Sequence, residues 1–156
     1  MKHTTLLFLL TDDRILLAMK KRGFGVGRWN GVGGKIEPNE TIEDAAAREC
    51  YEEIGVRPLR LQRVAHLTFT FPDGTPDVLT HVFVTQTWQG KPVETEEMAP
   101  QWFAHTDIPY DTMWPDDRLW LPYVLSGKKL VAGFGFDEDE RMLPETTTIN
   151  LVNELP

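Results

Sequence analysis

Residues 34 to 56 constrain the fold more than any other part of the chain, because they contain a short helix with both ends marked. Thr41 is a suitable N-cap residue with Asp44 as its capping partner, and Gly55 is a typical C-terminal stop. These signals predict a helix from residue 41 to 54. Residues three or four positions apart share a helix face, so a group of acidic side chains projects together: Glu49, Glu52 and Glu53.

These glutamates repel one another unless a cation neutralises them. Like charges at this spacing destabilise a helix by roughly a few tenths of a kcal/mol per pair. Carboxylate oxygens without a neighbouring His or Cys favour Mg²⁺ or Mn²⁺ over zinc, and protein-bound Mg²⁺ commonly contacts substrate phosphates. A solvated acidic face is the simpler interpretation of a glutamate-rich helix, so the helix alone leaves both alternatives open.

The spacing of residues around the helix resembles the Nudix box, the signature of the Nudix hydrolase family. That pattern is Gly, five residues, Glu, seven residues, then Arg-Glu-aliphatic-any-Glu-Glu-any-Gly-aliphatic. Cys50 replaces a larger aliphatic residue, a change that affects packing more than chemistry. The positions in register are Gly34, Glu40, Arg48, Glu49, Glu52, Glu53, Gly55 and Val56. The resemblance implies the Nudix αβα sandwich, a mixed β-sheet flanked by helices.

The remaining pattern is mainly that of strands, which agrees with an α/β (α+β) fold. At this length we expect a single domain spanning residues 1–156. The glycine-rich residues 23–27 lack the Walker ending and predict a loop. Strands are predicted at 4–10, 14–20, 59–71, 77–88, 129–136 and 146–152. A second helix is predicted to open at Trp114-Pro115-Asp116-Asp117, with apolar positions at Leu119, Trp120, Tyr123 and Val124.

Composition limits the possible partners and compartments. A net charge of −8 argues against a nucleic-acid polymer, because such binding needs a basic face. The single cysteine excludes an intramolecular disulfide, as suits a reducing compartment. The short apolar start lacks a cleavage site and no segment is long enough to cross a membrane, so we expect a cytoplasmic monomer without a membrane partner.

The Nudix resemblance also implies a metal site and catalytic residues. Glu52 would be a ligand or the base that activates water, and Arg48 would orient the glutamates, although an ordinary intrahelical ion pair is nearly as good an interpretation. Glu97 is a candidate further ligand or base, with a solvated acidic loop as the alternative. The implied metal ligands are the carbonyl of Gly34 and the carboxylates of Glu49, Glu52, Glu53 and Glu97.

Beyond the box, the chain resembles the oxidised-purine nucleoside triphosphatases of the mammalian MutT type within this family. The matching segments are Met19–Gly25, Gly27–Gly31, Phe69, Phe71, Pro92–Glu94, Met113–Asp117, Trp120, Pro122 and Phe134–Phe136. The resemblance implies a base pocket formed by Asn30, Trp114, Asp116 and Asp117. It implies that Thr5 and Lys20 lie near the sugar. It also implies pocket walls formed by the aromatic residues Phe24, Phe69, Phe71, Trp120 and Phe136. Val78 stands where that group has a methionine in the pocket wall.

The paired aspartates suit the recognition of an oxidised guanine. Oxidation at C8 turns N7 from an acceptor into a donor, which a carboxylate can bind. Two adjacent carboxyls enclosed by tryptophans would repel if both were ionised, so one should hold a proton and donate to a base carbonyl. The simpler interpretation is that Pro115, Asp116 and Asp117 only start a helix and that the aromatics are core residues.

Three basic residues at the end of the second predicted strand also leave two interpretations. Lys20, Lys21 and Arg22 could meet the negative charge of a substrate, or could be strand-edge charges that discourage aggregation.

We therefore expect a Mg²⁺-dependent enzyme, with Mn²⁺ as a possible substitute, that hydrolyses oxidised purine (deoxy)nucleoside triphosphates such as 8-oxo-dGTP and 2-oxo-dATP. The products would be the monophosphate and pyrophosphate, formed by water attack at the β-phosphorus. Two alternatives remain: a Nudix hydrolase of another nucleoside diphosphate derivative, and a non-catalytic nucleotide sensor. The intact glutamates disfavour the sensor, because binding alone does not need a metal-activated water.

Overall fold

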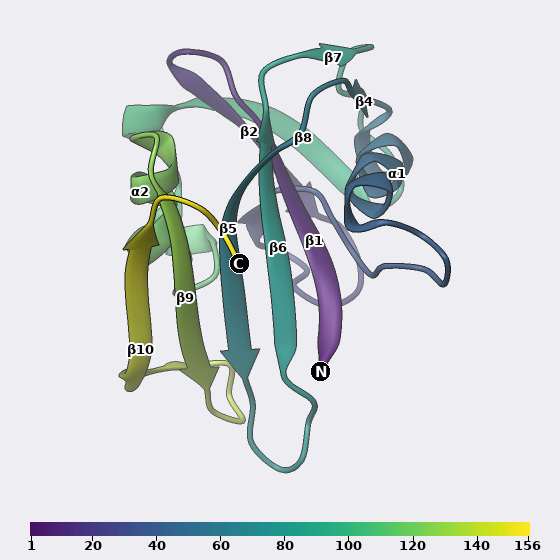
Figure 1. Ribbon diagram of the computed structural model, residues 1–156. Coiled ribbons are helices and arrows are strands. Elements are labelled where there is room, and N and C mark those ends of the chain that lie inside the picture. The colour runs from purple at the N-terminus through teal and green to yellow at the C-terminus, as the bar shows by residue number, and fades with distance from the viewer.

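Two α-helices, α1 (Ile42–Ile54) and α2 (Asp117–Leu125), flank a mixed β-sheet in the computed structural model, which describes residues 1–156 (Figure 1). The larger sheet has the order β1-β6-β5-β9-β10 and a second sheet has the order β3-β2-β8. Their strands are β1 (Lys2–Leu9), β2 (Arg14–Lys20), β3 (Trp29–Asn30), β5 (Gln62–Thr70), β6 (Val78–Thr85), β8 (Met98–Ala104), β9 (Lys129–Phe136) and β10 (Met142–Val152). The short elements are the strand pair β4 (Arg57–Pro58) and β7 (Trp88–Gln89), and the 3₁₀ helices η1 (His105–Asp107) and η2 (Tyr110–Thr112). The expected mixed sheet flanked by helices is confirmed.

The first helix begins and ends where its capping residues predict. The Thr41 hydroxyl accepts a hydrogen bond from the Asp44 backbone N–H at 3.1 Å. At the other end Gly55 adopts a left-handed φ of 74°, and its N–H donates to the Tyr51 carbonyl at 2.9 Å. A side chain is strained in that conformation, so Gly55 allows the chain to turn away directly after the glutamates.

The first two predicted strands both form, but they separate into different sheets. They are joined across residues 11–13, where Leu10 and Ile15 form an antiparallel bridge. Beyond that bridge, β1 pairs in parallel with β6, whereas β2 pairs antiparallel with β8. Because β2 is buried along most of its length, its sequence shows no alternation of apolar and polar residues that would indicate which sheet it joins.

Sequence reasoning missed strand β8. Its sequence contains Pro100, which cannot donate a ladder hydrogen bond and therefore lowers the strand signal. In the structure β8 lies at the edge of the three-stranded sheet, where a proline is tolerated. The predicted hairpin of β5 and β6 and the closing strands β9 and β10 are confirmed, with β10 starting earlier than expected, at Met142.

The second helix differs from its prediction in two details. It starts at Asp117 with Asp116 as the N-cap residue, not at Trp114. Of its four predicted apolar positions, Tyr123 is 41% exposed, whereas Leu121, which was not among them, is buried. The reason is that the helix packs its Trp120 and Leu121 side against the sheet, and this turns position 123 towards solvent.

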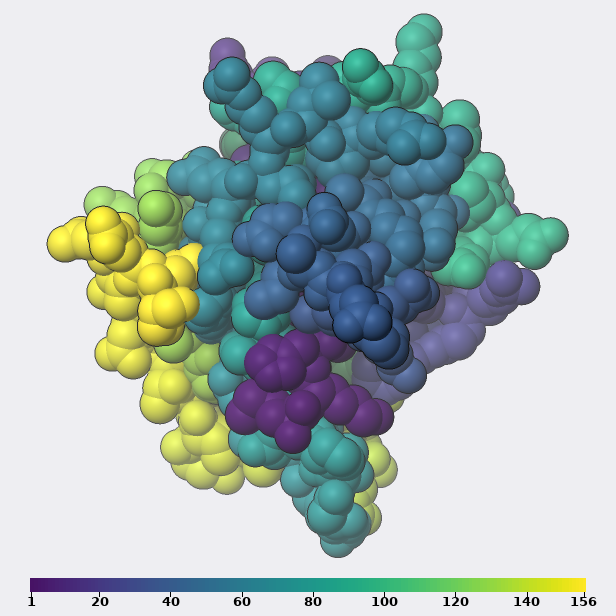
Figure 2. Space-filling model, turned by 45° about the vertical axis from the view of Figure 1, so that its right-hand side comes forward, coloured from purple at the N-terminus to yellow at the C-terminus, as the bar shows by residue number.

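The apolar core lies in two parts, one on each face of the larger sheet. Alternate residues of β1 serve both: Leu7 and Leu9 pack with α1, whereas Phe8 packs with Trp120 of α2. Figure 2 shows α1 on the molecular surface above the N-terminal residues of β1, with the turn between β5 and β6 projecting below. None of the helices is both long and apolar enough to cross a bilayer.

Candidate active site

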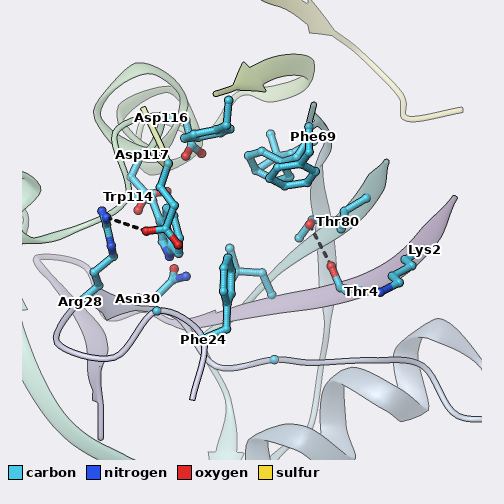
Figure 3. Close-up of a pocket in the computed structure, with 18 of the residues that line it drawn as sticks. Lys2, Thr4, Phe24, Arg28, Asn30, Phe69, Thr80, Trp114, Asp116 and Asp117 are labelled. Atoms are coloured by element: carbon cyan, nitrogen blue, oxygen red, sulfur yellow. Dashed lines mark hydrogen bonds and ion pairs between the residues drawn. The ribbon is translucent and has the colours of Figure 1, made fainter. Parts of the chain in front are cut away.

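One cavity of about 740 Å³ lies between β1, β5, β6, the segment before β3 and the start of α2 (Figure 3). A volume of this size suits a nucleotide-sized ligand. All of the predicted substrate-binding residues line it, namely Thr5, Lys20, Phe24, Asn30, Phe69, Phe71, Val78, Trp114, Asp116, Asp117, Trp120 and Phe136. Gly33 and Gly34 line the same cavity, so the loop before α1 connects it to the box glutamates.

Glu53 is the most deeply buried of the box glutamates. Its side chain is 1% exposed, and its Oε1 accepts a hydrogen bond from the Gly33 N–H at 2.9 Å. Its Oε2 is buried without any hydrogen-bond partner. The pKa of Glu53 is raised to about 8, mainly by burial and also by the negative charges of Glu49 and Glu97, against the opposing effects of the Gly33 hydrogen bond and of Lys20. A buried carboxylate of this kind is stabilised by a nearby cation.

Arg48 links the box residues to one another. Its Nε donates to Glu40 Oε2 at 2.7 Å, and its Nη1 donates to Glu49 Oε1 at 3.0 Å and to Glu52 Oε2 at 3.3 Å. Its Nη2 donates to the Lys35 carbonyl at 3.0 Å, which fastens the loop before the helix. Both interpretations of Arg48 are therefore compatible with its contacts, since it pairs with Glu49 and also forms an intrahelical ion pair with Glu52.

The basic residues at the end of β2 have different roles. Lys20 lines the cavity, whereas Lys21 donates to Glu94 Oε2 at 2.6 Å and Arg22 lies 3.7 Å from Glu97 Oε1. Only Lys20 is therefore placed to meet a substrate in the cavity. The other two fasten the acidic loop that precedes β8.

A second contact ties the acidic loop to the end of α1. The Thr95 hydroxyl donates to the Glu53 carbonyl at 2.8 Å and accepts from the Glu97 N–H at 3.3 Å. This places Glu97 near enough for its charge to contribute to the raised pKa of Glu53. The Glu97 side chain is about half exposed, so both predicted interpretations of this residue are compatible with its position.

The residues at the box end fit a divalent cation. Their free donors are hard oxygens: the unpartnered Glu53 Oε2 and the Glu49 carboxylate, whose own pKa is raised mainly by burial. A Cβ at Gly34 would lie 2.7 Å from that carboxylate, so the glycine leaves the space open. No three His, Cys, Asp or Glu side chains converge in metal-binding geometry, and one oxygen of each carboxylate is hydrogen bonded, that of Glu49 to Arg48 and that of Glu53 to the Gly33 N–H.

Asp116 and Asp117 lie at the opposite end of the cavity, called the base end after the base pocket that the resemblance predicts, and both are buried. The Trp120 indole N–H donates to Asp116 Oδ2 at 2.8 Å, while Asp117 Oδ2 has no partner. Burial raises the pKa of Asp116 to about 6, and burial together with the charge of Asp116 raises the pKa of Asp117 well above its usual range. This agrees with the expectation that one of the two holds a proton near neutral pH.

Aromatic rings and an amide complete the base end. Trp114 stacks on Phe24 with 5.1 Å between ring centroids and meets Phe136 edge-on at 6.2 Å. Phe24 is 72% exposed, so this ring covers the cavity from the solvent side. The Asn30 side-chain oxygen accepts from the Gly31 N–H at 2.8 Å, which leaves its NH₂ group free to donate to a ligand.

Several polar residues of the cavity were missed by sequence reasoning: Lys2, Thr4, Arg28, Lys35, Thr80, Asp137, Glu138 and Glu140. Arg28 lies within a segment that matches the family, but nothing in the sequence indicated its contacts. Thr4 and Thr80 hydrogen bond through their hydroxyls at 2.9 Å across β1 and β6. Their place on the cavity side follows from strand alternation only once the parallel pairing of β1 with β6 is known.

The sequence matches the NUDIX domain family over residues 1–124. It is similar to the oxidized purine nucleoside triphosphate hydrolase of Mus musculus, with 46% identity over 140 residues covering 89% of each chain. It is also similar to the protein of the same name from Danio rerio, with 44% identity over 135 residues covering 86% of each chain.

A solved structure supports the fold independently. The MutT protein of Bacillus halodurans superposes with a TM-score of 0.83 over 99% of this chain and 100% of its own, at 22% identity. At that identity the similarity concerns the fold alone. This fold similarity, the domain match and the two relatives all agree with the arrangement of the box residues around α1. The chain belongs to the Nudix family and is a Nudix hydrolase.

Proposed function

We propose that this Nudix hydrolase cleaves oxidised purine (deoxy)nucleoside triphosphates, such as 8-oxo-dGTP and 2-oxo-dATP, to the monophosphate and pyrophosphate, with Mg²⁺ as its metal. The observation that carries the proposal is a single cavity with two buried aspartates at one end and the box loop at the other. The names of the mouse and zebrafish relatives, both above 40% identity, support the same substrate class.

The base end can distinguish an oxidised guanine by its hydrogen bonds. Near neutral pH the ionised Asp116 accepts from the N7–H that oxidation creates, and the protonated Asp117 donates to a carbonyl of the base. The Asn30 NH₂ group donates to a further acceptor on the base edge. An unmodified guanine presents an acceptor at N7, so it places that acceptor against the Asp116 oxygen that Trp120 does not bind, which is costly.

The box end would hold the metal through the Glu49 and Glu53 carboxylates and the Gly34 carbonyl, with Glu52 and Glu97 as further candidates. When bound, Mg²⁺ supplies positive charge that offsets the charge of the phosphate oxygens. Lys20 adds a positive charge from β2. Water attacks the β-phosphorus, the bond to the oxygen bridging the α- and β-phosphates breaks, and the nucleoside monophosphate leaves. Glu52, which is largely exposed, accepts the proton of the attacking water and returns it to solvent.

We further propose that the enzyme acts on free nucleotides as a cytoplasmic monomer. Its one cysteine, Cys50, is buried and unpaired in α1, as suits a reducing compartment. The acidic net charge of −8 disfavours a nucleic-acid polymer as an alternative substrate.

The test is a comparison of 8-oxo-dGTP, 2-oxo-dATP and dGTP under Mg²⁺, with pyrophosphate and orthophosphate measured separately. We expect pyrophosphate as the inorganic product and a kcat/KM for an oxidised base at least roughly tenfold above that for dGTP, as hydrogen-bond discrimination allows. Preference for dGTP over both oxidised substrates would refute the assigned substrate class. Release of orthophosphate would show that the enzyme does not cleave the bond between the α- and β-phosphates.

A further inference from the structure

Arg28 is held in one position at the edge of the base pocket. Its guanidinium lies 4.1 Å from the centroid of the Trp114 ring, a distance typical of a cation–π contact. Its Nη1 donates to the Met113 carbonyl at 3.2 Å, and its Nη2 lies 3.5 Å from Glu140 Oε2 in the loop between β9 and β10 (Figure 3). Three contacts with two segments, Met113–Trp114 and the loop that holds Glu140, therefore fix the guanidinium plane.

The Trp114 ring lies between Arg28 and Phe24 (Figure 3). Phe24 stacks on it at 5.1 Å but is 72% exposed, so few contacts hold the phenyl ring there. The face of the indole towards Arg28 is occupied by a guanidinium that two further contacts hold, one to the Met113 carbonyl and one to Glu140. A planar base can therefore reach Trp114 only from the Phe24 side, with Arg28 supporting the ring from behind.

Arg28 also supplies positive charge to the paired aspartates. It is the cation that lowers the pKa of both Asp116 and Asp117, against the larger effect of burial. Burial raises the pKa of the Tyr110 phenol in η2, and the charge of Asp117 contributes to the same shift. The charged and titratable side chains on the neighbouring segments are Arg28 between β2 and β3, Tyr110 in η2, Arg118 in α2 and Glu140 between β9 and β10.

We propose that Arg28 is a positioning residue of the base pocket, which fixes the Trp114 ring for stacking on the purine and faces the two aspartates with a positive charge. Arg28 thus contributes both to where the base lies and to the pH range over which the pocket presents one donor and one acceptor. The inference rests on the proposed function, because it assigns Arg28 to reading the base and not to splitting the phosphate chain.

Two substitutions separate the two roles. Arg28→Gln removes the charge and the cation–π contact, so KM for 8-oxo-dGTP should rise roughly tenfold, while kcat at saturating substrate stays within about threefold. Without the positive charge the aspartates hold their protons more strongly, so the pH profile of kcat/KM should move up by roughly half a unit or more. Arg28→Lys keeps the charge but loses the planar fork, so it should retain the wild-type pH profile with KM still raised severalfold.

Arg60→Gln, which removes the same charge from an exposed position between β4 and β5, is the matched control and should leave both quantities unchanged. A KM within twofold of wild type in both Arg28 variants would overturn the positioning role, and a pH profile unchanged in Arg28→Gln would overturn the electrostatic one. If Arg28→Gln does not fold, Arg28→Lys still tests the positioning role. If wild type itself does not prefer 8-oxo-dGTP over dGTP, the proposed function fails instead, so the two failures are distinguishable.

Discussion

The box pair Glu49 and Glu53 and the base-end pair Asp116 and Asp117 are both carboxylate pairs whose pKa values burial raises, yet their surroundings favour different chemistry. Around Glu49 and Glu53 the structure places Arg48, a glycine loop and an unpartnered carboxylate oxygen that leaves room for a cation. Around Asp116 and Asp117 it places aromatic rings and a single indole donor. The same functional group therefore suits a metal ion at one end of the cavity and a proton at the other.

The physical reason is how each pair lowers the cost of burying negative charge. A divalent cation needs several oxygen ligands at short range, and the box loop supplies a carbonyl beside the carboxylates. A proton needs no further ligands, so two adjacent aspartates in an apolar enclosure can share one and present an acid beside a carboxylate. The comparison holds only if the two ends respond differently to loss of charge, and the following substitutions test that.

The largest effect should come from Glu53→Gln. The Gly33 N–H can still donate to the amide oxygen, so the fold should persist, but the lost negative charge weakens the metal site and turnover should fall by roughly 10² or more. The measurement is the steady-state rate of pyrophosphate release, with circular dichroism to check folding. Glu145→Gln, on the exposed part of β10, is the control. Turnover within threefold of wild type would remove Glu53 from the metal site.

Asp116→Asn should mainly weaken recognition of the base. If the amide oxygen accepts from the Trp120 N–H, the NH₂ group faces the base and opposes an N7–H, so KM for 8-oxo-dGTP should rise about ten- to hundredfold. Asp117→Asn is the matched variant. It replaces a carboxyl that already holds a proton, so KM for 8-oxo-dGTP should rise only severalfold. KM values for 8-oxo-dGTP and dGTP provide the measurement. A larger effect at position 117 than at 116 would reverse the assigned protonation.

Arg48→Lys tests whether the box end depends on a fixed array of charges. Lysine cannot bind Glu40 and Glu49 together as the guanidinium does, so the Mg²⁺ concentration for half-maximal activity should rise roughly tenfold. The rate at saturating Mg²⁺ should largely recover, and the preference for 8-oxo-dGTP over dGTP should not change. Arg63→Lys, on the pair with Glu43, is the control. A changed base preference in Arg48→Lys would contradict the separation of the two ends.

The smallest effect concerns stability against pH. The unfolded chain releases the Asp116 proton near pH 3.8, while burial delays its release in the folded protein to about pH 6. The folded state therefore binds more protons between these values, and stability contributed by this group is lost as pH rises from about 4 to about 6. Asp116→Asn lacks this loss, so its advantage over wild type should grow across that interval by about 1 to 3 kcal/mol, as measured by urea unfolding. If the difference in unfolding free energy between Asp116→Asn and wild type does not vary with pH, the raised pKa does not belong to Asp116.

Much of the fold was predictable because its signals are local. The caps of α1, the hairpin of β5 and β6 and the closing strand β9 all follow from turn residues and short-range periodicity. Strand β8 was missed because Pro100 lowers a local strand propensity that an edge position tolerates. The exposure of Tyr123 did not follow from its apolar character, because a helix that is apolar on more than one side does not itself indicate which side meets the sheet.

The predicted site residues divide in the same way. The proposed metal ligands within the box follow from spacing along one helix and its preceding loop, and every predicted substrate-binding residue lines the cavity. Their catalytic and binding roles stay predictions until they are tested. Arg28 could not be assigned a role from sequence, since its partners Met113 and Glu140 are distant along the chain and meet it only through folding.

The sequence by itself determined a capped glutamate helix and the residue types needed for phosphate and purine chemistry, because hydrogen bonds and side-chain directions within one helix depend only on nearby residues. The tertiary structure decided that β1 and β2 join different sheets, that the aspartates lie across one cavity from the box loop, and that Arg28 supports Trp114. Burial and distance between remote segments set those arrangements. These same quantities make one carboxylate pair suited to a cation and the other to a proton.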